Sequence, residues 1–124
     1  MLLRFLGKES LPDQSPTLYR TDQDSYVIQG WIVTDAAALA AAEVAADENL
    51  VEIPPKLLSH LAKDGLSGDV AHVAPPIVYV LPNGNYVVKG ARVIDPATLN
   101  QMHIPADETC VAVARTAAAA LVTK

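Results

Sequence analysis

The sequence predicts an α+β fold made of two tandem strand-strand-helix-strand-helix repeats, packed with pseudo-twofold symmetry into one domain. The main observation is internal similarity, because residues 15–61 align without a gap with residues 75–121, a shift of sixty positions. Turn-forming residues between strand-like runs, and an aspartate at the start of a helical run, recur at equivalent places in both copies. Fourteen of the 47 aligned positions are identical, and in the first copy these are Pro16, Tyr19, Tyr26, Val27, Gly30, Val33, Asp35, Ala37, Leu39, Ala46, Asp47, Glu48, Val51 and Leu61.

The repeat sets the boundaries within a single globular domain. We expect an N-terminal extension over residues 1–14, repeat copy 1 over 15–63, a connector over 64–74 and repeat copy 2 over 75–124. The extension has no counterpart in copy 2. It is expected to add an edge strand or to dock across the sheet.

Each copy is expected to open with a β-hairpin. In copy 2, the sequence Asn83-Gly84 between two strand-like runs is a strong hairpin signal, since both residues tolerate positive φ. A two-residue turn centred there predicts that Tyr79 faces Val88 and that Tyr86 shares the sheet face of Tyr79. The same register in copy 1 pairs Tyr19 with Ile28.

The remaining elements of each copy follow from turns and caps. Gly30 and Gly90 interrupt the second strand at equivalent positions, which predicts a bulge or a close backbone crossing. Asp95 before Pro96 reads as a helix N-cap, and Asp35 takes that place in copy 1. The third strands are expected over 49–53 and 109–113. Second helices are expected from residue 55 to about residue 63 and from residue 114 to about residue 122.

The charge pattern argues against two classes of partner. The chain carries a formal net charge of −5, with nine acids against four bases in residues 1–60. Nucleic acid and an anionic membrane surface both require a basic surface, so neither is expected as a partner. No apolar run approaches the roughly 20 residues that span a bilayer. The single cysteine, Cys110, suits a reducing compartment, and we expect a cytoplasmic protein without cofactors.

Candidate chemical groups have simpler structural interpretations. Cys110 aligns with Leu50, which indicates a buried strand position. The three histidines, His60, His72 and His103, share no metal-ligand spacing, so no metal site is expected.

Paired carboxylates are the strongest catalytic pattern in the chain. Asp47-Glu48 and Asp107-Glu108 can divide acid and base roles where their environments separate their pKa values. Both pairs lie in polar helix-to-strand turns, which favours solvated loop acids. No catalytic residue is therefore assigned.

Four residues remain as candidates for a ligand or partner surface: Trp31, Arg92, Tyr26 and Tyr86. Trp31 aligns with Ala91 and Arg92 with Ile32, so neither is required by the shared scaffold. The tyrosines supply rigid area with a polar tip.

Two resemblances accompany these patterns. Arg4-Phe5-Leu6-Gly7-Lys8-Glu9-Ser10, Ser15-Pro16-Thr17-Leu18-Tyr19 and Tyr26-Val27-Ile28-Gln29-Gly30-Trp31 resemble small actinobacterial proteins with an internal duplication, a resemblance that covers most of the chain and implies no established activity. Val51-Glu52-Ile53-Pro54-Pro55-Lys56-Leu57-Leu58, then Gly68-Asp69-Val70, is similar to the swapped-hairpin domains of transition-state regulators and antitoxins. This second resemblance implies a DNA-binding dimer, for which the basic residues are missing here.

The sequence thus favours a non-enzymatic protein-binding or regulatory module that engages a protein partner or itself. The alternative is a small-molecule-binding protein or enzyme with its site between the two repeats. An antitoxin-like DNA-binding dimer is the third interpretation.

Overall fold

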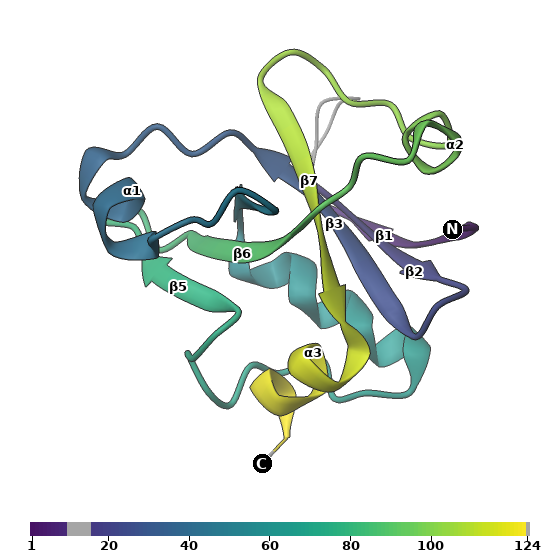
Figure 1. Ribbon diagram of the computed structural model, residues 1–124. Helices are drawn as coiled ribbons and strands as arrows, with labels where there is room; N and C mark the ends of the chain where they lie inside the picture. The colour runs from purple at the N-terminus through teal and green to yellow at the C-terminus, as the bar shows by residue number, and fades with distance from the viewer. Residues whose placement is uncertain (10–15, 124) are drawn as a thin grey trace.

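The computed structural model describes residues 1–9 and 16–123. The predicted α+β class is confirmed: in these described residues, seven antiparallel strands form one sheet, flanked by short helices (Figure 1). The strands are β1 Leu3–Lys8, β2 Thr17–Thr21, β3 Ser25–Trp31, β4 Glu48–Ile53, β5 Ile77–Val80, β6 Tyr86–Arg92 and β7 Glu108–Ala114. The helices are α1 Ala36–Ala42, the 3₁₀ helix η1 Pro55–Asp64, α2 Pro96–Leu99 and α3 Arg115–Val122.

The two halves of the chain exchange strands. β3 pairs with β7 along the full length of both strands, and β4 pairs along its full length with β6. β3 and β4 thus each have a long partner in the second half. Shorter pairings of β3 with β4 and of β6 with β7 complete a ring of four strands.

Two glycines permit the strands to cross closely. A Cβ atom on Gly30 would lie 2.5 Å from the carbonyl oxygen of Glu52, and one on Gly90 would lie 2.5 Å from that of Ala112. No side chain fits at either position without a shift of the neighbouring backbone. The predicted close backbone crossing is therefore confirmed in both halves.

The predicted hairpin register is wrong by one residue. Tyr79 pairs with Val87 rather than Val88, and Tyr19 pairs with Val27 rather than Ile28. Each turn contains three central residues rather than two, and the third, Asp24 or Gly84, has positive φ. Such three-residue loops consist of a type I turn followed by a left-handed residue.

The register error also misplaced the tyrosines. Tyr86 packs against the main core cluster, whereas Tyr79 packs against the second cluster with Val87. Successive strand residues point to opposite faces, so a shift of one residue reverses the face. The two tyrosines of this hairpin therefore lie on opposite faces of the sheet.

The main core draws on both halves of the chain. Its members share burial on one side of the strand ring, under η1 and α3, and include Ile28, Val51, Val88, Val111, Leu57, Leu58 and Leu121. A second cluster lies on the other side, where Ala38 and Ala42 of α1 cover Leu50, Leu81 and Val87. Because both halves supply the main core, the interior between them is filled with apolar side chains.

Local signals explain the helix boundaries. Asp35 and Asp95 cap α1 and α2, with each carboxylate accepting a backbone N–H of the first helical turn. Gly65 ends η1 in the left-handed conformation, with φ of 84°. The connector then returns along α3, where the N–H groups of Ala71 and His72 donate to the carbonyl of Leu121.

The N-terminal extension supplies β1, which pairs antiparallel with β2 at one end of the sheet. Residues 10–14 of the predicted extension lie outside the described residues. No described helix has the length and apolar character needed to cross a membrane.

Candidate functional site

The two edge strands of the sheet are β1 and β5. β2 and β5 differ in how their outer edges are covered. β2 has β1 along its outer edge, whereas in the described part of the chain β5 pairs with β6 alone. Val80 of β5 is 46% exposed. β5 therefore presents an open strand edge.

The backbone of Val80 points toward this open edge. Leu81 donates its N–H to the carbonyl of Asn85, on the β6 side. Because backbone groups alternate along a strand, the N–H and C=O of Val80 face the opposite way. Arg20, sixty residues earlier, faces β1, where it pairs with Arg4. Val80 thus has the orientation that accepts a strand at the other end of the sheet.

The residues before β1 continue past the first hairpin turn to α2. Leu2 and Asp22 exchange two hydrogen bonds, from Leu2 N–H to the Asp22 carboxylate and from Asp22 N–H to the Leu2 carbonyl. Beyond them, the Gln101 side chain donates to the Met1 carbonyl at 2.7 Å and accepts from Leu3 N–H at 2.9 Å. The segment is therefore held between a hairpin turn and a helix, and Figure 1 shows α2 beside this end of the chain.

An open groove lies at the equivalent place beside β5. It has a volume of about 320 Å³ and is lined by Thr34, Asp35, Glu52, Leu81, Pro82 and Asn83. We call these six residues the turn–helix groove, because they join the second hairpin turn to the start of α1. Asp35 accepts the N–H of Ala38, and Glu52 accepts the side-chain amide of Asn85. Neither carboxylate forms an ion pair with a described residue.

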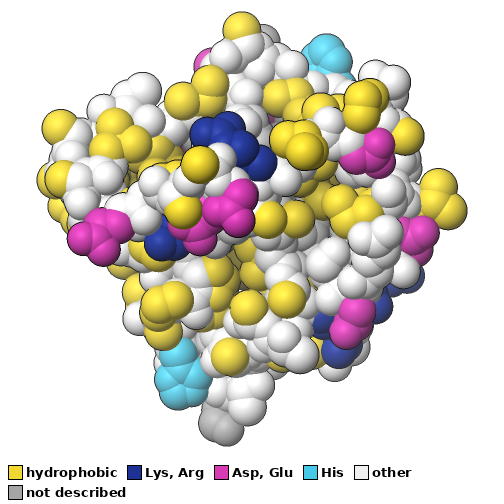
Figure 2. Space-filling view, viewed as in Figure 1, with side chains coloured by type: hydrophobic (Ala, Val, Ile, Leu, Met, Phe, Trp, Pro, Cys, Tyr) yellow, Lys and Arg dark blue, Asp and Glu magenta, His cyan; other side chains and the backbone are white. Residues whose placement is uncertain are grey.

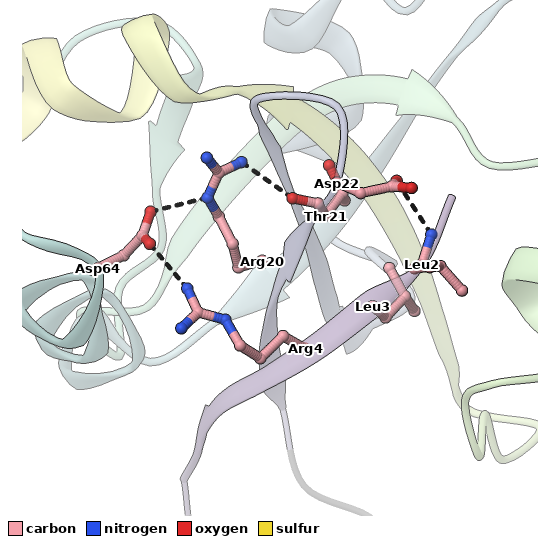
Figure 3. Close-up of a pocket in the computed structure, with 7 residues that line it drawn as sticks. All are labelled: Leu2, Leu3, Arg4, Arg20, Thr21, Asp22 and Asp64. Carbon is pink, nitrogen blue, oxygen red and sulfur yellow. Dashed lines mark hydrogen bonds and ion pairs between the residues drawn. The ribbon is translucent and has the colours of Figure 1, made fainter.

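A second hollow, of about 340 Å³, lies beside β1 and β2 (Figure 3). Arg4 and Arg20 reach from these strands to Asp64 at the end of η1, with N···O distances of 2.9 and 3.0 Å. Arg115 contacts the same carboxylate at 3.1 Å, and the hydroxyl of Tyr26 donates to it at 2.6 Å. Asp64 thereby joins β1, β2, β3, η1 and α3.

The charges in this cluster shift two pKa values. Burial would raise the pKa of Asp64, but hydrogen bonds from Tyr26 and Arg115 and the charge of Arg20 together lower it. Burial and the bond to Asp64 raise the pKa of Tyr26 to about 12. Asp64 thus stays ionised and Tyr26 neutral, which is the arrangement of a structural ion network.

Another acid was misplaced by the sequence analysis. Glu108 was expected in a solvated turn, but it is only 4% exposed. Gln29 donates from Nε2 to Glu108 Oε1 at 2.8 Å and to the His103 carbonyl at 2.7 Å. Glu108 Oε2 and Gln29 Oε1 are buried and accept no hydrogen bond from a described residue. Burial raises the pKa of Glu108 above its usual range.

The second half has a cation, Lys89, at the position that Gln29 takes in the first half. Lys89 lies 3.7 Å from Glu48 and donates to the Ala42 carbonyl at 3.0 Å. Gln29 aligns with Lys89 and Glu108 with Glu48, so one acid has a charged partner and the other a neutral one. No hydrogen bond or ion pair between described residues joins the two predicted acid pairs.

The four predicted surface residues are dispersed. Tyr26 is fully buried, so it is not on a partner surface, because it packs in the core with its hydroxyl on Asp64. Tyr86 and Trp31 are half-buried, and Arg92 is exposed with Nε donating to the Ala46 carbonyl. Trp31 pairs with Glu108 and Arg92 with Val111 on opposite edges of β7, so the two do not meet as strand neighbours.

The other candidates lie apart from the groove. Cys110 is buried, and burial raises its pKa to about 11, so it stays a thiol at neutral pH. Within residues 1–9 and 16–123, no three His, Cys, Asp or Glu side chains gather as metal ligands. Gly68-Asp69-Val70, which carries the antitoxin resemblance, lies in the connector and in no strand.

Basic side chains occupy small separate groups on the face shown in Figure 2. No family model, no curated protein and no solved structure matches this chain significantly. The candidate site therefore rests on geometry, and it is the open edge of β5 together with the turn–helix groove.

Sequence analysis missed this site, although one signal pointed to it. The N-terminal extension has no counterpart in copy 2, so among the described residues the first strand of copy 2 lacks the partner that the first strand of copy 1 has. The ion network at Asp64 left no such signal, because Arg4, Tyr26 and Arg115 are far from it in the sequence.

Proposed function

We propose that the two halves are copies of one unit related by pseudo-twofold symmetry, and that the protein is a non-enzymatic protein-binding module. Its binding surface is the open edge of β5, which accepts an extended segment of a partner as an added strand. One observation carries this proposal. β1 covers the outer edge of β2, and the equivalent edge of β5 is uncovered by any described strand.

Equivalent contacts in the two halves support the proposed symmetry. Ile32 N–H donates to the Asp107 carbonyl and Arg92 N–H to the Asp47 carbonyl, both at 2.9 Å. Each of these residues lies sixty positions from its equivalent. The close crossings at Gly30 and Gly90 likewise involve partners sixty positions apart.

The chemistry of the edge supports a short strand as the ligand. Main-chain hydrogen bonds supply affinity in strand addition, and alternating side chains supply specificity. Pro76 and Pro82 flank the open edge and lack N–H groups, so the paired stretch is limited to a few residues. A short, flanked edge accepts a defined segment and disfavours open-ended aggregation.

The free thiol of Cys110 suits a reducing compartment. We place the module in the cytoplasm, where the free thiol Cys110 is stable, and we expect neither nucleic acid nor membrane as its partner. Self-association through β5 is a special case of strand addition, in which the added strand belongs to a second copy.

The test uses a synthetic peptide with the sequence of residues 1–8, because this segment already pairs with an equivalent edge. We expect saturable binding by fluorescence anisotropy, and we expect Val80→Pro to abolish it. Proline removes the outward N–H of an edge residue and leaves the bond between Leu81 and Asn85 intact. Equal binding by wild type and Val80→Pro would contradict the proposal.

Controls test the register of the docked strand, the folding of the variant and self-association. The peptide methylated at the nitrogen of the residue opposite Val80 loses a hydrogen bond to that edge, whereas methylation at the next residue does not. Circular dichroism checks that Val80→Pro remains folded. Sedimentation of the wild type alone reports self-association, which would appear as a dimer that Val80→Pro dissociates.

A further inference from the structure

The turn–helix groove lies where the beginning of a docked strand would be. β1 runs antiparallel to β2, and the residues before its paired stretch pass the turn at Asp22. A strand added antiparallel to β5 would likewise place its preceding residues beside Pro82 and Asn83, which line the groove. The groove is thus continuous with the proposed binding edge.

The charge of the groove is one-sided. Asp35 and Glu52 face it from α1 and from β4, and neither forms an ion pair with a described residue. Each carboxylate is half-buried and has one oxygen committed to a neutral donor. The neutral lining residues are Thr34, Leu81, Pro82 and Asn83, so no described cation lines the groove.

The corresponding part of the β1 site shares one acid with the groove and differs at two other positions. Asp95, which aligns with Asp35, lies 3.5 Å from the terminal amine of Met1. Ala112 aligns with Glu52, and Gln101, two residues after the end of α2, aligns with Ala41 of α1. Gln101 binds the backbone of the segment before β1 through its amide. The α1 helix has alanine there and offers no such amide, so recognition at this end depends on the two carboxylates.

We propose that the segment docked on β5 carries a basic side chain, Lys or Arg, two or three residues before the residue that pairs with Val80, and that Asp35 and Glu52 bind it in the turn–helix groove. This inference rests on the proposed function, because the docked strand sets the position of the cation. The two carboxylates select an antiparallel direction of the docked strand as well as a basic side chain near its beginning. A parallel strand would place its preceding residues at the opposite end of β5.

The test compares two acetylated peptides based on residues 1–8, so that the terminal amine makes no contribution. One has lysine at its second position, two residues before the residue opposite Val80, and the other has glutamine there. At low ionic strength we expect about fivefold tighter binding of the lysine peptide, as for a partly exposed ion pair with two acids. The preference should shrink in 0.5 M salt.

The matched variants are Asp35→Asn and Glu52→Gln. Asparagine still caps α1, and glutamine still accepts the Asn85 amide, so the fold is retained while the charge is removed. The double variant should bind both peptides with the weaker affinity of the glutamine peptide. Glu43→Gln, an exposed acid at the other end of α1, should retain the preference.

Three results would overturn the inference, and they differ in what they say of the proposed function. Equal binding of both peptides that Val80→Pro abolishes would remove the cation and leave strand addition in place. Binding of neither peptide would overturn both proposals. A free diamine such as putrescine that binds wild type and Val80→Pro equally would make the groove a small-molecule site.

Discussion

At the scale of single residues, the two halves differ in the partner of an equivalent acid: Glu108 is paired with the neutral Gln29. Lys89 aligns with Gln29 and lies 3.7 Å from Glu48, the acid that aligns with Glu108. Gln29 supplies hydrogen bonds and no charge. No cation among the described residues therefore bonds directly to Glu108, and its burial favours the protonated form.

Glu108 should make the protein less stable as the pH rises. Because its pKa is raised on folding, its contribution is full below the usual Glu pKa and is lost as pH rises through the native value. The loss is about 1.4 kcal/mol for each unit of pKa difference. Glu108→Gln should remove this decline and exceed the wild type in stability at pH 8, as measured by urea unfolding between pH 4 and 8.

Two variants control this prediction. Gln29→Lys supplies the missing cation and should also flatten the decline. Glu48→Gln removes an acid that already has Lys89 and should lower stability at pH 8 by less than about 1 kcal/mol. A Glu108→Gln variant that is less stable than the wild type at pH 8 would contradict this prediction.

The hydroxyl of Tyr26 should stabilise the fold through Asp64. Tyr26→Phe removes a 2.6 Å hydrogen bond to a carboxylate, and a loss of about 2 kcal/mol is expected for a bond to a charged group. The loss should vanish at a pH where Asp64 is protonated, because the lowered pKa of Asp64 stabilises the fold only above it. Tyr86→Phe is the control, and an equal loss there would contradict the assignment.

At the scale of elements, local chemistry made some features predictable from the sequence. Asp35 and Asp95 were readable as caps, and Gly30 and Gly90 as close crossings, because each acts through its own backbone. The hairpin register was not readable, since Asn83-Gly84 fits a two-residue turn as well as the three-residue loop that forms.

The glycines at the strand crossings should tolerate no side chain. Gly30→Ala and Gly90→Ala each place a Cβ 2.5 Å from a backbone carbonyl oxygen, so a loss of about 2–3 kcal/mol is expected for each. Gly84→Asn is the control, because its surroundings are open and Asn tolerates positive φ. Denaturant unfolding measures the difference. Losses under 0.5 kcal/mol at both crossings would contradict the close approach.

Some features could not be predicted from the sequence because they depend on long-range contacts. The burial of Glu108 and the joining of Tyr26 to Asp64 depend on pairing between distant strands. Periodicity within one strand carries no information on which strand lies beside it. The unmatched N-terminal extension was visible, but its meaning required the pairing of β1 with β2.

At the scale of the whole molecule, strand exchange makes the halves depend on each other. The long ladders join β3 to β7 and β4 to β6, and the main core takes residues from both halves. Neither half retains its long pairings when alone. Two fragments divided within the connector, at Ser67, should therefore be unfolded separately and regain the native circular dichroism spectrum when mixed. A folded first fragment alone would contradict this dependence.

The central claim is that the edge of β5 accepts a strand as the edge of β2 does. Backbone amide exchange, read by NMR for each residue, tests it most directly. On saturation with the peptide of residues 1–8, exchange at Val80 should slow at least tenfold, while Leu81, already bonded to Asn85, should change little. Unchanged exchange at Val80 in the peptide-saturated protein would contradict the claim.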